Sequence, residues 1–243
     1  MNARATEVVF LPGFDGDAAL RSAFVAAIAE HLPARAIGYP NRALGSLNGY
    51  ARLVAGELPP ESRPLVVAES FSGLVASRWA AKDPHVAGLV LCGAFARSPA
   101  MLAALGARLP SISQFLGAHF LNPIGFAPSD PARRRWSQGL AQAISGMERD
   151  VVAERLRLIA EEDVSRELAS LRMPVVVVEF SEDLVVGRAA TSQLASCCAS
   201  PIRLRIPGPH FAIETRPREC AAALLPCMAP FFEKSHPAQM VNG

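Results

Sequence analysis

The sequence has little lysine, few cysteines and a small net charge. The net charge and the cysteines each argue against a class of protein. Only Lys82 and Lys234 stand among 24 basic residues, and 22 acidic residues bring the net charge to +2. So small a charge argues against nucleic acid as a partner. The five cysteines are odd in number and lack the spacing of metal ligands, so we expect reduced thiols rather than disulfides or a metal site.

Long hydrophobic runs are also absent. No apolar stretch reaches the length that crosses a bilayer, and the six residues before the first apolar run leave no room for the hydrophobic region of a signal peptide. We therefore expect a soluble, cytoplasmic protein without a membrane span. At 243 residues and 51% hydrophobic composition, the chain can still build one sizeable core.

Short runs of Val, Ile and Leu alternate with longer amphipathic stretches, a pattern typical of buried parallel strands connected by helices. We predict strands at 7–11, 34–39, 65–69, 87–92, 174–180 and 202–206. The predicted helices are 18–31, 47–57, 71–82, 189–198 and 217–232, with Asp17 as the N-cap of the first. The fold class is therefore α/β, with a doubly wound, mostly parallel six-stranded sheet. Between Ser98 and Leu171 only helical patterns occur, which predicts a helical cap at 98–171 inserted into a core of residues 1–97 and 172–243.

A candidate nucleophile lies where the third strand runs into a helix, in the segment Ala68-Glu69-Ser70-Phe71-Ser72-Gly73. A sharp strand-to-helix turn strains the backbone of the nucleophile and accepts only small side chains two positions before and after it. Ser70 meets this requirement, whereas Ser72 has the bulky Leu74 two positions later. An ordinary crossover in a doubly wound sheet would carry similar residues, so the segment alone leaves both interpretations open.

Two further candidates follow later strands. Asp183 lies in an acidic turn after the strand at 174–180, and His210 follows the strand at 202–206. Among the five histidines, His210 alone is placed at the carboxyl end of a predicted strand, where functional groups gather in open α/β sheets. A single histidine at such a place is more commonly a hydrogen-bonded loop residue. The order serine, acid, histidine, each after a different strand, favours a catalytic role instead.

Together these segments resemble the α/β-hydrolases, and the resemblance covers nearly the whole chain. The family's pentapeptide has glycine at both flanking positions, where this chain has Ala68 and Ser72, and Glu69 stands where many members have histidine. Two strands of the full family core are missing at the amino terminus, as in compact members. The missing strands belong to the far edge of the sheet, so we expect the site to be unaffected.

The resemblance implies a role for each candidate. Ser70 would be the nucleophile, His210 the general base and Asp183 the acid that orients the base. The family's spacing favours Asp183 over its neighbour Glu182, which we expect in solvent.

A glycine-rich loop, Pro12-Gly13-Phe14-Asp15-Gly16, follows the first strand. Backbone N–H groups in such a loop can approach a developing oxyanion closely. The resemblance places the oxyanion hole at the N–H groups of Phe14 and Phe71. A tight turn that needs glycine for its backbone conformation explains the same loop equally well.

These roles imply a serine hydrolase that cleaves a carboxylic ester or thioester through an acyl-enzyme, with no metal or organic cofactor. Other chemistry of the same fold stays open, namely hydrolysis of carbon–carbon bonds, lyase or perhydrolase activity. A non-catalytic ligand-binding protein is a third alternative, although such a protein need not retain all three residues.

Substrate contacts are expected from the cap, with Phe115, His119 and Trp136 as candidates. Most apolar cap side chains must pack the cap itself, and both interpretations predict the same spacing. The run Arg133–Arg135 could meet an acidic partner, such as the carrier protein recognised by similar carboxylesterases in biotin synthesis. We favour the solvated face of a helix for this run.

Overall fold

The computed structural model describes residues 4–99 and 131–232, without the side chains of residues 131–136. Six parallel strands form one sheet in the order β2-β1-β3-β4-β5-β6. They are β1 (Glu7–Leu11), β2 (Ala34–Ala36), β3 (Pro64–Glu69), β4 (Gly88–Cys92), β5 (Val175–Phe180) and β6 (Ile202–Ile206). The predicted α/β class with a doubly wound sheet is confirmed.

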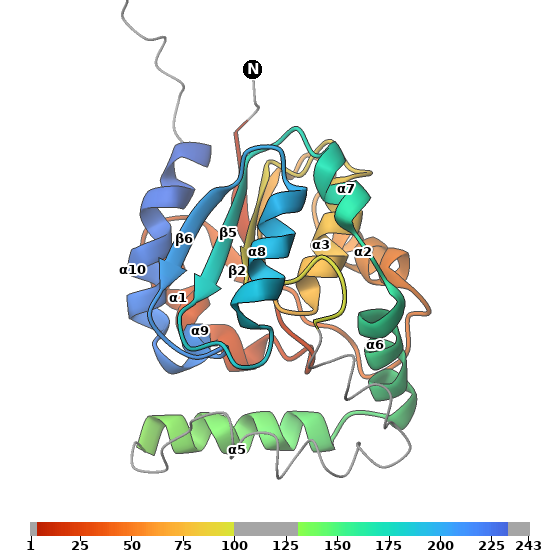
Figure 1. Ribbon diagram of the computed structural model, residues 1–243. Coiled ribbons are helices and arrows are strands. Elements are labelled where there is room, and N and C mark those ends of the chain that lie inside the picture. Colours follow the sequence, from red (N-terminus) through yellow and green to blue (C-terminus); the bar gives the residue numbers. More distant parts are fainter. Residues whose placement is uncertain (1–3, 100–130, 233–243) are drawn as a thin grey trace, which may run out of the picture.

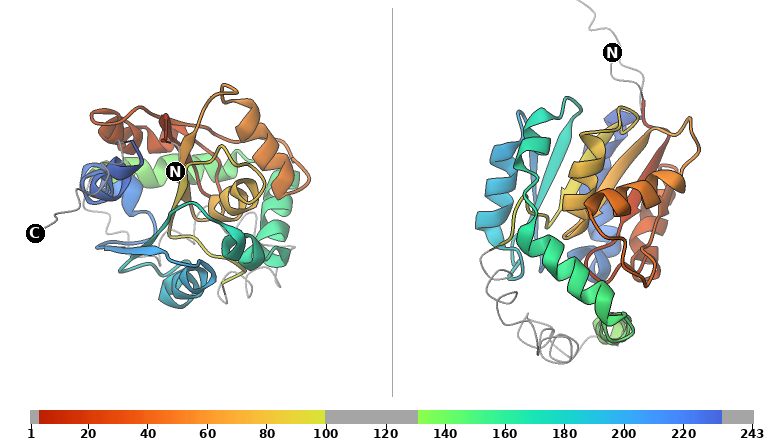
Figure 2. Two further views of the ribbon diagram at one scale, coloured as in Figure 1. Left: turned by 90° about the horizontal axis from the view of Figure 1, so that it is seen from above. Right: turned by 90° about the vertical axis from the view of Figure 1, so that its right-hand side faces the viewer.

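Helices cover both faces of the sheet (Figures 1 and 2). Side chains alternate between the faces along each strand, so every buried strand contributes to two cores. One core contains Val66 and Leu91 and is covered by α2 (Leu47–Gly56), α3 (Ser72–Ala80) and α8 (Gly187–Cys197). The other contains Val67 and Val90 and is covered by α1 (Ser22–Ala29), α9 (Ala212–Thr215) and α10 (Pro217–Met228). The central strands β3 and β4 are buried along their whole length, which explains their continuous apolar sequences.

Within the described residues, three helices lie between β4 and β5 in the sequence. They are α5 (Pro131–Ser145), α6 (Arg149–Glu161) and α7 (Ser165–Ser170). Figure 1 shows α5 lying across the end of the sheet toward which the strand arrows point. An antiparallel bridge joins Arg97 to Asp163, so both flanks of the insertion adjoin each other, and Leu168 of α7 packs into the core. The cap boundaries at 98 and 171 stay a prediction.

Several predicted elements differ from the structure at their ends. The strand predicted at 34–39 ends at Ala36, because the chain then turns aside and the N–H of Tyr39 donates to the carbonyl of Gly16 in a loop. The helix predicted at 18–31 consists of a 3₁₀ turn, η1 (Ala19–Arg21), followed by α1. The break falls at Arg21, whose buried side chain forms ion pairs with buried carboxylates.

The capping role predicted for Asp17 was wrong by one position. Ala18 occupies the N-cap of the 3₁₀ turn, while Oδ1 of Asp17 accepts the N–H of Ala19 at 2.8 Å. The α10 pattern predicted to 232 ends at Met228, and a 3₁₀ turn, η3 (Ala229–Phe231), follows it. Among the described helices, none combines the length and apolar composition of a membrane span.

Candidate active site

Ser70 lies between β3 and α3 with its backbone in the left-handed region. Its φ of 51° is the only positive value at a non-glycine position within the described residues. The N–H of Ser70 donates to the carbonyl of Cys92 at the end of β4, and its own carbonyl accepts the N–H of Gly73, each at 2.9 Å. A turn fixed on both sides in a strained conformation is typical of a nucleophile elbow.

The competing hydroxyl, Ser72, is fully buried and committed to other groups. It donates to the backbone carbonyl of Pro12 and lies in hydrogen-bond contact with the hydroxyl of Tyr39. Ser72 therefore fastens the start of α3 to the loop after β1.

Asp183 and His210 form a buried pair, each side chain only 3% exposed. Nδ1 of His210 lies 2.8 Å from Oδ2 of Asp183. The other oxygen, Oδ1, accepts the backbone N–H groups of Val185 and Val186 at 2.9 Å. These contacts orient the carboxylate, which places the imidazole proton on Nδ1 and leaves Nε2 as the basic atom. The rival carboxylate of Glu182 is exposed.

Ser70 and this pair both adjoin the end of β4. A Cβ atom on Gly93 would lie 3.1 Å from Nδ1 of His210 and 3.2 Å from Oδ2 of Asp183. Cys92, the residue before Gly93, accepts the hydrogen bond from Ser70. The absence of a side chain at Gly93, whose φ is 51°, therefore makes room for the pair beside the strained serine.

Charge sets the protonation of both members of the pair. Burial alone would lower the pKa of His210, but the charge of Asp183, its hydrogen bond and the nearby Glu69 together raise that pKa above its usual value. Burial alone would raise the pKa of Asp183, whereas His210 and the two backbone N–H groups lower it. The site thus favours a carboxylate facing an imidazole that binds a proton readily.

The predicted oxyanion donors, Phe14 and Phe71, lie on the two segments that approach Ser70. Phe71 follows it at the start of α3, and Phe14 lies in the loop after β1. Within the described residues, neither backbone N–H donates to a protein acceptor. A residue of the insertion holds this loop in place: Nη1 of Arg155 donates to the carbonyl of Phe14 at 2.6 Å.

A buried cluster of four ionisable side chains lies beside this site. The guanidinium of Arg21 contacts Asp15 at 2.5 Å, Glu69 at 2.9 Å and Glu214 at 3.0 Å, and all four side chains are at most 3% exposed. Asp15 belongs to the loop after β1, Glu69 precedes the nucleophile, and Glu214 lies in α9 just after His210. Arg21 therefore joins the three segments that carry the candidate residues.

The protonation of this cluster is uneven. Burial and the neighbouring Glu69 raise the pKa of Glu214 well above its usual value, which favours the neutral form of this side chain. Burial alone would lower the pKa of Arg21, but the three carboxyl groups raise it, and Arg21 remains charged.

The predicted substrate contacts cannot be placed in the same way. Phe115 and His119 lie outside the described residues. Trp136 and the run Arg133–Arg135 belong to α5, but their side chains are also outside the described part.

Arg21, Glu214, Gly93 and Arg155 were not predicted from the sequence. One signal was available, because the acidic Glu69 ends a strand that is otherwise apolar and must find a cation if buried. Nothing in the sequence identified its partner among the many arginines.

Comparisons with solved structures agree on the fold. A thermophilic esterase from Thermogutta terrifontis is 17% identical, over 96% of this chain and 92% of that one, with a TM-score of 0.76. An esterase from Rhodococcus sp. ECU1013 is 20% identical over 93% and 91%, with a TM-score of 0.74. The enol-lactonase from Burkholderia xenovorans LB400 is 19% identical over 94% and 92%, with a TM-score of 0.75. At these identities the likeness concerns the fold alone.

Comparison with families gives a more specific result. No curated protein matches the sequence significantly. The sequence model of the alpha/beta hydrolase family matches residues 8–223, from the first strand to the last long helix. The match includes the strained serine and the buried aspartate–histidine pair. The chain therefore belongs to the alpha/beta hydrolase family.

Proposed function

We propose that the protein is a serine hydrolase that cleaves a carboxylic ester or thioester, with Ser70 as nucleophile, His210 as general base and Asp183 as the orienting acid. One observation carries the proposal. The only strained non-glycine residue of the described chain is a serine, and it adjoins the end of β4 beside a buried, hydrogen-bonded Asp183–His210 pair. A crossover without catalytic function has no need of this strain.

The first half of the reaction forms an acyl-enzyme. Nε2 of His210 takes the proton from Ser70 while Oγ attacks the acyl carbon, and the N–H groups of Phe14 and Phe71 stabilise the oxyanion. Asp183 stabilises the imidazolium that results. The imidazolium then returns its proton to the alcohol or thiol as the bond from the acyl carbon to that group breaks.

The second half regenerates the enzyme. Water attacks the acyl carbon of the ester formed on Ser70, and His210 accepts the proton of that water. Collapse of the intermediate expels the serine oxygen, which recovers its proton from the imidazolium. The products are a carboxylic acid and the alcohol or thiol.

The names of similar structures support acyl chemistry without fixing the bond. Two of them are esterases, and one is an enol-lactonase. Hydrolysis of carbon–carbon bonds, lyase or perhydrolase activity would use the same three residues, and a ligand-binding protein would use none of them for turnover.

Steady-state kinetics test the proposal. Turnover of 4-nitrophenyl esters and of acyl thioesters is measured with acyl chains of graded length. We expect cleavage by the wild type, and a loss of about a thousandfold or more in kcat for Ser70→Ala and for His210→Ala. Ser77→Ala is the matched control, because it removes a buried hydroxyl of α3 that donates to the carbonyl of Gly73 in the same helix and to which the mechanism assigns no step.

Circular dichroism checks that each variant is folded. Near-wild-type turnover by Ser70→Ala or His210→Ala would contradict the assigned roles. If no ester or thioester is cleaved by folded wild-type protein, the alternative chemistries and the binding protein take precedence.

A further inference from the structure

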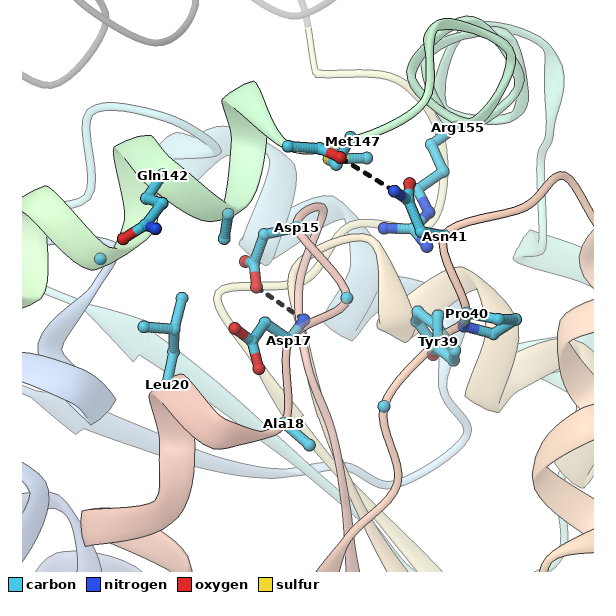
Figure 3. A pocket seen from close by; sticks show the side chains of 15 residues that line it. Asp15, Asp17, Ala18, Leu20, Tyr39, Pro40, Asn41, Gln142, Met147 and Arg155 are labelled. Atoms are coloured by element: carbon cyan, nitrogen blue, oxygen red, sulfur yellow. Dashed lines mark hydrogen bonds between the residues drawn. The ribbon is translucent and has the colours of Figure 1, made fainter.

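A cavity of about 790 Å³ opens beside the loop that carries Phe14. Its walls come from the loop after β1 (Asp15–Ala18), the loop after β2 (Gly38–Asn41), and the insertion, through Gln142 of α5, Met147 of the turn that follows it and Arg155 of α6. Figure 3 shows the side chain of Arg155 directed from α6 toward Asn41, with Asp15 and Asp17 on the loop after β1. The cavity thus adjoins the candidate oxyanion loop and is bordered on one side by the insertion.

Arg155 is 1% exposed, yet several of its hydrogen-bond donors are unused. Nε donates to the hydroxyl of Tyr50 at 3.1 Å, and Nη1 donates to the carbonyl of Phe14 at 2.6 Å. A guanidinium has five N–H groups, and the remaining ones have no acceptor within the described residues. They belong to a residue that lines the cavity, so they are available to a ligand there.

The positive charge of Arg155 also has no direct counterion. Within the described part of the chain, no carboxylate lies within 4.0 Å of its guanidinium. Aromatic rings surround it instead, with its Cζ atom 5.4 Å from the ring centre of Tyr39 and 5.6 Å from that of Tyr50. The adjacent Glu154 accepts N–H groups of Leu44 and Gly45 and the hydroxyl of Tyr50, so its negative charge reaches Arg155 only through that hydroxyl.

A buried guanidinium without a paired anion is costly, and a bound anion would offset that cost. A carboxylate suits the planar guanidinium fork, which can donate two parallel hydrogen bonds to it. A dianionic group such as phosphate suits the cavity less, because the carboxylates of Asp15 and Asp17 line the same space. Asp15 forms an ion pair with Arg21, whereas Asp17 has no cationic partner within the described residues.

We propose that this cavity is a substrate subsite in which Arg155 binds a carboxylate, so that the ester or thioester substrate carries one carboxylate besides the bond that is cleaved. The assignment of that bond rests on the proposed function. The subsite itself does not, because it consists of groups outside the candidate triad.

Equilibrium binding tests the subsite without turnover. The full-length Ser70→Ala protein is titrated calorimetrically with adipate and with its neutral counterpart adipamide. We expect adipate to bind at least about tenfold more tightly. When Arg155→Gln is added to the Ser70→Ala protein, the preference for adipate over adipamide should disappear. Arg157→Gln is the matched control, because it removes the same charge from an exposed position of the same helix, outside the cavity.

A second variant keeps the test decisive if Arg155→Gln does not fold. Asp17→Asn removes from the cavity a negative charge that repels adipate. This variant should therefore tighten adipate binding without tightening adipamide binding. Equal affinity for adipate and adipamide, or an unchanged preference in folded Arg155→Gln, would overturn the subsite. So would Asp17→Asn that leaves adipate binding unchanged.

Kinetics with the otherwise wild-type protein relate the subsite to catalysis. Two ester pairs place the carboxylate in either half of the substrate: monoethyl adipate against ethyl 6-methylheptanoate, and carboxymethyl butyrate against isobutyl butyrate. In at least one pair, kcat/KM should favour the carboxylate by about tenfold or more, and Arg155→Gln should abolish that ratio. The ratio cancels any general loss caused by releasing the Phe14 carbonyl.

The two proposals fail separately. Adipate binding with no cleavage of any ester would leave the subsite standing and contradict the ester hydrolase. Cleavage of all four esters without a carboxylate preference would leave the hydrolase standing and contradict the subsite.

Discussion

At the scale of single residues, the charges around His210 shift its pKa and, under the proposed mechanism, the pH range of activity. The charged groups that act on its pKa are Asp183, Glu69 and Arg21, of which the two carboxylates raise it and the guanidinium lowers it. Glu214 adjoins Glu69, and burial together with Glu69 raises its pKa, which favours the neutral form. Glu69 therefore has a second effect besides its bond to Arg21.

This arrangement predicts opposite results for two similar substitutions. His210 must lose its proton to act as a base, so kcat/KM falls on the acidic side as His210 becomes protonated. Glu69→Gln removes a negative charge that raises the pKa of His210, and the acidic limb should move to lower pH. Glu214→Gln replaces a neutral acid with a neutral amide and should leave that limb in place.

The pH profile of kcat/KM for the two variants and the wild type checks this prediction. A purely structural role for the cluster would reduce kcat/KM in both variants without moving the limb. An equal displacement in both would contradict the assigned protonation of Glu214.

The three candidate catalytic residues could be predicted from the sequence, but the buried ion pairs beside them could not. The order of Ser70, Asp183 and His210 after successive strands was visible in the sequence, and the structure places Asp183 in contact with His210. The partner of Glu69 was not visible, because Arg21 lies 48 positions away and sits in a stretch that resembles an ordinary helix start. Such contacts depend on the packing of segments that local patterns do not specify.

At the scale of elements, the ends of β3 and β4 bring the reacting groups together. The chain leaves β3 through Ser70 at φ 51° and leaves β4 through Gly93 at the same angle. A side chain at Gly93 would press on the Asp183–His210 pair. Two neighbouring strands thus end in left-handed residues, of which one presents a hydroxyl and the other leaves space.

Gly93→Ala tests this role of the end of β4. The new methyl group should displace the imidazole and reduce kcat/KM by about tenfold or more, and the left-handed backbone should cost about 1 to 2 kcal/mol of stability. Gly187→Ala is the matched control, because Gly187 has a φ of 76° but a methyl group added there would meet no other atom within 4 Å.

Kinetics and urea unfolding are measured for both variants. The two should lose similar stability, and only Gly93→Ala should lose activity. Equal activity in the two variants would show that the space beside His210 is not needed.

Regular elements were more predictable than the turns between them. Continuous Val and Leu runs predicted β3 to β5 within one residue at either end, because buried parallel strands are apolar on both faces. The edge strand β2 was predicted too long, since its apolar residues continue into a loop bonded to Gly16. The four-residue helix α9 was not predicted, because so short a segment has no periodicity.

At the scale of the whole molecule, the sheet and the insertion meet at the candidate site. Residues from the loop after β1, the turn after β3 and the loops after β5 and β6 gather at the carboxyl edge of the sheet, as open α/β folds require. The insertion contacts this edge through Arg155 on the Phe14 carbonyl and through Asn41, which bonds the α5–α6 junction at Gly146 and Glu148. The described part of the insertion is thus in direct contact with the loop that carries the proposed oxyanion donor Phe14.

Covalent labelling of the intact protein tests the central claim most directly. A fluorophosphonate reacts with an activated serine hydroxyl, so incubation at neutral pH followed by mass spectrometry should show one adduct, on the peptide that contains Ser70. The adduct should be absent in Ser70→Ala and form far more slowly in His210→Ala. An unmodified Ser70 in folded protein, or an adduct confined to another serine, would contradict the account.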